Sequence, residues 1–233
     1  VIEAVGPRRF HGITSDNTGN TTVARDLNKK DYAWIIILPD SCHRMSLLCK
    51  DISKITYFEL VIANIKTSIR YFKKSSFANA HLRTCRKQLC IGCGLVSVGK
   101  TRFATLYHSG ESLLHCLPAI SSLCKENIIS AQFKFRLEEF ATILKPLAKS
   151  ITCLESTHST ISDVYIFWLA SMAELHAFIT EPTNSLDNAV KEEIRCNANH
   201  RFKQMIDHAP DDVYLTGFVL DPRAFSFKDA QSK

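Results

Sequence analysis

Acidic and amide side chains follow a short apolar run near the amino terminus, in the stretch GITSDNTGN at 12–20. We expect Asp16 at the carboxyl end of a strand, where open α/β sheets place their ligands. A carboxylate there can hold Mg²⁺, which takes one or two protein carboxylates and keeps several waters. The alternative is that Asp16, Asn17 or Asn20 begins the next helix as a cap or an Asx turn. These residues alone favour the capping role.

A second polar group follows the next apolar run, in LPDSCHRM at 38–45. Asp40, Cys42 and His43 come just after this run, so neighbouring strand ends would place them beside Asp16. The alternatives are that Asp40 is the N-cap of the following helix and that His43 is a hydrogen-bonded linker residue.

Cysteines offer a possible metal site, because Cys90 and Cys93 form a CxxC pair with Cys85 nearby. Zinc needs four ligands, and Cys116 and Cys124 lack the spacing of a second pair. We interpret these residues as thiols without a metal. The odd total of nine cysteines and the lack of a secretory segment indicate reduced thiols in an intracellular protein.

The letters of a phosphate-binding loop are present in GLVSVGKT at 94–101. That motif must leave a buried strand and open a helix so that its backbone amides surround phosphate. The preceding KQLCIGC is a poor strand, so nucleotide binding is the minor alternative.

The whole chain has a net charge of +6. Basic residues are concentrated between Glu59 and Glu111, where the sequence has no Asp or Glu. The segment carries Lys66, Arg70, Lys73, Lys74, Arg83, Arg86, Lys87, Lys100 and Arg102. Such a charge distribution favours a polyanion such as nucleic acid as the partner. A solvated helix face is the alternative.

The elements that would position these residues begin with a small α/β unit. The sequence predicts a strand, a helix and a second strand, in a β-prone stretch at 8–16, a helical pattern at 21–31 and the apolar run YAWIIILPD at 32–40. This order implies a parallel pair of strands. The second strand, rich in β-branched residues, is expected to be buried on both faces.

The remainder of the chain shows helical spacing. Apolar residues from Ile52 to Phe72 predict one long amphipathic helix, followed by breaks near 75–79 and 90–102. Further helices are predicted at 111–126, 132–156, 160–180 and 185–208, the third opened by a Thr160–Asp163 capping box and the last carrying Asp187 in its first turn. No apolar run is long enough to cross a bilayer. The predicted fold is mainly α with a small α/β part.

Four blocks, taken in order, resemble the hAT superfamily of transposases, particularly the fungal members with a ribonuclease H-like domain. GITSDNTGN is similar to the family's TDNASN block, and DSCHRMSLLCKDI resembles its C-x-x-H-x-L-N-L block. SVGKTRFAT resembles the Thr-Arg-Trp block, and VYLTGFVLDPR resembles the LLDPR block.

The resemblance implies roles for particular residues. Asp16 would be the second of three metal-binding acids, and His43 would match a conserved histidine. The chain departs from the family in having Asp40 where relatives have Cys, with Cys42 beside the histidine. Phe103 stands where many relatives have a Trp that handles a flipped base, so it would still offer a ring for stacking. Gly94–Thr101 would then belong to a helical insertion.

The resemblance also implies two parts: an incomplete ribonuclease H-like core of two parallel strands at 1–43, and a helical insertion domain at 44–233. Because the chain begins with Val, we expect a fragment whose first and third acids lie outside it. Cleavage by this machinery needs two divalent ions held by three carboxylates. We therefore expect little or no strand cleavage, and no tight binding of the Mg²⁺ that the full-length family uses.

The expected function is that of a transposase-derived DNA-binding fragment, nuclear by its resemblance, with the basic segment contacting phosphates. Oligomers would form through regions not present. Two alternatives stay open: an active nuclease completed by flanking sequence or in trans, and a protein-interaction module that has lost its chemistry.

Overall fold

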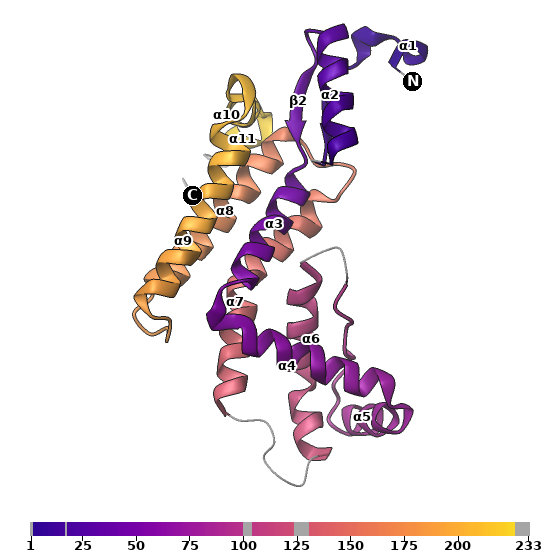
Figure 1. Ribbon diagram of the computed structural model, residues 1–233, viewed down its shortest axis with the longest axis vertical. Coiled ribbons are helices and arrows are strands. Elements are labelled where there is room, and N and C mark those ends of the chain that lie inside the picture. The colour runs from indigo at the N-terminus through magenta and orange to yellow at the C-terminus, as the bar shows by residue number, and fades with distance from the viewer. Residues whose placement is uncertain (1, 17, 100–103, 124–130, 227–233) are drawn as a thin grey trace.

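The protein is mainly helical, with a two-stranded parallel sheet at one end, as the sequence predicts (Figure 1). The computed structural model describes residues 2–16, 18–99, 104–123 and 131–226. Its elements are α1 (Ile2–Val5), η1 (Pro7–Arg9), β1 (Gly12–Ser15), α2 (Gly19–Asp31), β2 (Ile36–Pro39), α3 (Ser41–Ser53), α4 (Thr56–Lys74), α5 (Ser76–Gln88), α6 (Ala104–Leu123), α7 (Ala131–Leu154), α8 (Ile161–Thr180), α9 (Asn188–Phe202), η2 (Lys203–Asp207), η3 (Pro210–Asp212), α10 (Val213–Val219) and α11 (Pro222–Ser226).

The small sheet pairs β1 with β2 in parallel, from Gly12 opposite Ile36 to Ser15 opposite Pro39. The prediction that β2 is buried on both faces is wrong, because Leu38 is its only buried residue. Full burial of a parallel strand needs a layer on each face, and in the described residues the sheet has two strands. The side chains of Val23 and Leu27 on α2, which could have supplied such a layer, are exposed.

The single long helix predicted from Ile52 to Phe72 is also wrong, because the chain turns between α3 and α4. Ile55 takes an extended backbone (φ −61°, ψ 125°) and precedes α4. Ile52, Ile55 and Phe58 are all buried. Their three-residue spacing therefore belongs to a corner between two helices and not to one face of a continuous helix. Beyond this corner, α4 turns away from α3 and crosses the lower part of the molecule (Figure 1).

Helices α7 and α8 follow the predicted ranges closely, whereas α6 begins at Ala104 and not at the predicted 111. Helix α8 opens with the predicted capping box, in which Thr160 and Asp163 exchange side-chain and backbone hydrogen bonds. Helix α9 begins at Asn188, so its predicted start at Ser185 is wrong. Asp187 is its N-cap, with the carboxylate accepting from the Val190 N–H at 2.8 Å. Ser185 turns toward α7 instead.

One hydrophobic core joins the helices, and Trp168, Phe58 and Phe140 are its largest fully buried side chains. Leu38 of β2 belongs to the same core, so the sheet is packed onto the helical part. No helix in the described ranges is long and apolar enough to cross a membrane.

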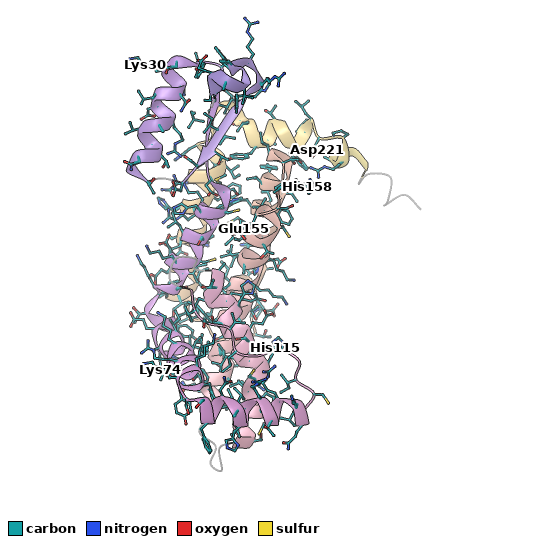
Figure 2. The ribbon with its side chains drawn as sticks, turned by 90° about the vertical axis from the view of Figure 1, so that its right-hand side faces the viewer. Lys30, Lys74, His115, Glu155, His158 and Asp221 are labelled. Carbon is teal, nitrogen blue, oxygen red and sulfur yellow. The ribbon has the colours of Figure 1, made fainter. Side chains whose placement is uncertain are left out.

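The molecule is elongated. Lys30, at the end of α2, lies near one end, and Lys74, at the end of α4, lies toward the other (Figure 2). The strands end where the sheet passes into α3, so the carboxyl edge of the sheet faces the helical part. The two candidate sites predicted from the sequence are therefore separated along the long axis.

Candidate nucleic-acid interface

Helix α4 is strongly amphipathic and carries four cations on its exposed side. Its apolar residues, including Ile62, Ile65 and Ile69, are buried against the core. Lys66, Arg70, Lys73 and Lys74 recur at three- and four-residue steps, so they share the opposite, solvent-exposed side of the helix. The spacing of these residues in the sequence is therefore enough to predict that their side chains face solvent.

A groove of about 440 Å³ lies beside these cations, and residues 97–99 line its other side. This side is fixed by hydrogen bonds to α6. The Val96 N–H donates to the Ser112 hydroxyl and the Gly99 N–H donates to Thr105 Oγ1, both at 2.9 Å. Lys73 Nζ donates to Ser97 Oγ across the groove. The four cations thus line a formed groove as well as an exposed helix surface.

Helix α5 follows after a single residue, Ser75, which closes one helix and opens the next. Its N–H donates to the Tyr71 carbonyl at 3.1 Å, and its hydroxyl accepts from the Ala78 N–H at 3.1 Å. Because these bonds hold both helix ends, α5 leaves α4 at a defined angle. Arg83 and Lys87 lie one turn apart on α5 and are both exposed. We call Lys66, Arg70, Lys73, Lys74, Arg83 and Lys87 the basic face.

Arg86 differs from its neighbours because its side chain is half-buried. The guanidinium donates to the carbonyl oxygens of Gly92 at 2.9 Å and Ile91 at 3.4 Å. It therefore holds the segment after α5 in place, and with Arg83 and Lys87 it lines a second hollow of about 510 Å³. Arg86 therefore has a structural task, in addition to the charge that it would offer to a phosphate.

Three predicted contacts, Lys100, Arg102 and Phe103, lie outside the described residues, as does the end of the phosphate-loop motif. The part of that motif that is described, from Gly94 to Gly99, follows α5 and an irregular segment. A phosphate loop requires a buried strand at that point. The nucleotide-binding alternative therefore lacks its structural context.

At the other candidate site, the ends of β1 and β2 are joined by a hydrogen bond of 3.1 Å from the Asp40 N–H to the Ser15 carbonyl. Asp16 Oδ1 accepts from the Thr21 hydroxyl at 3.0 Å and the Thr18 hydroxyl at 3.3 Å. Asp40 Oδ1 accepts from the His43 N–H at 3.0 Å, which confirms Asp40 as the N-cap of α3. His43 lies in the first turn of that helix.

Arg25, which is 8% exposed on α2, has a role that no sequence pattern indicates. Its Nη1 donates to the carbonyl oxygens of Ser15 at 3.0 Å and Asp16 at 3.2 Å, so it fixes the end of β1. Nearby Arg44 donates to Gln204 at 3.0 Å. Burial lowers the pKa of Arg44, and the positive charges of Arg201 and Arg25 lower it further. Arg25 is thus the guanidinium group that contacts the end of β1 directly.

A metal site is not assembled here or at the CxxC pair. Within the described ranges, no group of three or more His, Cys, Asp or Glu side chains is placed to hold an ion. Cys90 and Cys93 are exposed, and the buried Cys116 thiol donates to the Cys93 carbonyl at 3.7 Å. Asp16 is thus a single carboxylate already engaged by two hydroxyls.

The geometry makes the basic face the best-formed candidate site, because it combines exposed cations with a formed groove. Comparisons with protein-family models, curated proteins and solved structures give no match. The hAT resemblance therefore stays a prediction, and functional inference depends on the residues themselves.

Proposed function

We propose that this chain is a transposase-derived DNA-binding fragment and that its basic face contacts DNA phosphates. One observation carries the proposal. In the described part of the chain, no carboxylate lies within ion-pair distance of any of the six basic-face side chains. Solvated surface cations are usually interspersed with acids, whereas these six cations have no ion-pair partner among the residues that the structure describes.

Phosphate groups are the ligands that such a face favours. Lys and Arg that neutralise phosphates release condensed counterions, which gives affinity without reading the base sequence. The sugar-phosphate backbone of the DNA would lie in the groove between α4 and residues 97–99, beside Lys66, Arg70 and Lys73. The proposed activity is therefore binding with little sequence preference.

The β1–α2–β2 unit supports the transposase part of the proposal. A parallel strand, helix, strand unit with Asp16 directly after β1 is compatible with the proposed ribonuclease H-like core. We propose no DNA strand cleavage by this chain. Asp40 is used as the cap of α3, and a single carboxylate, that of Asp16, cannot hold the two divalent ions that cleavage needs. DNA binding should then require neither Mg²⁺ nor Asp16.

The test is fluorescence anisotropy with a labelled DNA duplex over a range of salt concentrations. Lys66→Ala and Arg70→Ala should each weaken binding modestly and lower the slope of log affinity against log salt by about one. Lys30→Ala, at the far end of the molecule, is the matched control and should change neither quantity (Figure 2). Asp16→Ala should also bind like the parent. Affinity that is insensitive to salt would overturn the proposal.

A further inference from the structure

Two exposed aromatic rings accompany the cations at the corner between α4 and α5. Tyr71 is 61% exposed and Phe77 is 74% exposed. Single exposed apolar residues are common and need no explanation. These two are different because Tyr71 lies between Arg70 and Lys74 in the sequence, and Phe77 follows Lys74 by three residues.

Both rings are held in place although they are open to solvent. The Tyr71 ring packs edge-on against buried Phe72, with centroids 5.2 Å apart and planes at 80°. The Phe77 ring packs against His81 at 4.3 Å and 66°. Edge contacts of this kind orient a ring, while more than half of each residue stays exposed. Ser75, hydrogen-bonded to both helices, fixes the direction of α5, which carries Phe77, relative to α4, which carries Tyr71.

Charge and ring orientation together suggest a particular form of nucleic acid. We propose that the corner binds single-stranded DNA, with bases stacked on Tyr71 and Phe77 while the cations of α4 track the phosphates. This inference rests on the proposed function and narrows its substrate class. In a duplex the base faces are already stacked on one another, so exposed protein rings have no access to them. In a single strand every base offers a face, and stacking is tolerant of sequence.

The experiment compares an oligo-dT strand of about 12 nucleotides with a duplex of equal length, using anisotropy. Tyr71→Ala and Phe77→Ala should each weaken single-strand binding about tenfold with an unchanged salt slope. Their affinity for duplex should change less than about twofold, because duplex binding uses the phosphates alone. Phe135→Ala removes another exposed ring, on α7, and should bind both forms like the parent. Unaltered thermal unfolding of each variant shows that the fold is intact.

A conservative variant provides a direct signal of stacking. Phe77→Trp should keep the affinity for oligo-dT, and its added indole fluorescence should be quenched when a base stacks on it. The Trp34→Phe background removes the exposed native indole, and Trp168, which is fully buried, contributes a constant signal.

The outcomes separate the two proposals. Tenfold losses confined to single strands, together with quenching, support the inference. If the aromatic variants bind oligo-dT like the parent while Arg70→Ala weakens it, the stacking inference is overturned and phosphate binding stands. If the parent binds neither form, both proposals are overturned.

Discussion

The indole Nε1 of Trp168 donates a hydrogen bond of 2.9 Å to the hydroxyl of Ser41, and both residues are buried. Trp168 lies in the middle of α8, and Ser41 is the first residue of α3, directly after the sheet. This bond therefore ties the strand ends to the helical part. It also sits one residue from the Asp40 cap, so the junction is held by side chains from distant parts of the chain.

Ser41→Ala is expected to destabilise the protein by about 1–3 kcal/mol, because it leaves the buried indole N–H without a partner. Urea unfolding followed by Trp168 fluorescence measures the change, in a Trp34→Phe background that removes the exposed indole. The same background without the Ser41 change is the reference. A difference below about 0.5 kcal/mol would show that the bond is unimportant.

Asp40→Ala should cost about 0.5–2 kcal/mol through the loss of the α3 cap, whereas Asp40→Asn should cost little. An amide oxygen can accept from the His43 N–H as the carboxylate does. Chemical denaturation of both variants provides the test. Equal losses in the two variants would mean that the charge of Asp40, not its capping bond, stabilises the protein.

Glu139 is 6% exposed on α7 and accepts from three donors: the Tyr57 hydroxyl at 2.9 Å, the Ser185 hydroxyl at 2.8 Å and the Ser185 N–H at 3.2 Å. Burial raises the pKa of Tyr57, so this phenol stays a donor at neutral pH. Glu139→Ala should cost about 1–3 kcal/mol, since it leaves these donors unpaired.

The neighbouring Glu138 supplies the control for that change. It forms an exposed pair with Lys134 at 3.8 Å, so Glu138→Ala should fall within about 0.5 kcal/mol of the parent. Thermal and urea unfolding of both variants give the comparison. Similar losses at 138 and 139 would contradict a special role for the buried carboxylate.

Arg223 should make stability depend on pH. Its guanidinium contacts Asp221 at 2.7 Å and Asp163 at 3.1 Å. The hydrogen bond from Arg223 lowers the pKa of Asp221. Burial is the largest single effect on the pKa of Asp163 and raises it, but hydrogen bonds from Thr160 and Arg223 together lower it.

A carboxyl group with a lowered pKa in the folded state stabilises the protein above its unfolded pKa, about 3.9 for Asp. That contribution is lost as the pH falls through the folded value. Arg223→Gln should therefore reduce the free energy of unfolding more at about pH 7 than at about pH 3.5. Arg195→Gln, which breaks the exposed pair with Glu192, is the control. The same loss at both pH values would refute the linkage.

Features set by local sequence could be predicted, and those set by distant contacts could not. The capping box of Thr160 and Asp163 needs four consecutive residues, and it was predicted correctly. The corner at Ile55 was not predicted. The same spacing of apolar residues occurs in a continuous helix and in two helices that are joined by a buried turn. Glu139 and Ser185 are 46 residues apart, so no local pattern connects them.

The candidate site shows the same division. The exposed cations of α4 follow from helical periodicity, which the sequence displays directly. The other side of their groove could not be predicted from periodicity, because it depends on the hydrogen bonds from the Val96 and Gly99 N–H groups to α6. The half-burial of Arg86 likewise depends on how the chain folds back after α5.

Ser75 makes the length of the chain at the α4–α5 corner critical. Inserting one residue there would separate the two hydrogen bonds of Ser75, to Tyr71 and from Ala78, and would change the direction in which α5 leaves α4. Ala78 and Leu82, the buried residues of α5, would then lose their places in the core. The irregular segment from Leu89 to Gly99 has no helical phase to preserve. Relatives of this protein should therefore vary in length in that segment and keep the corner unchanged.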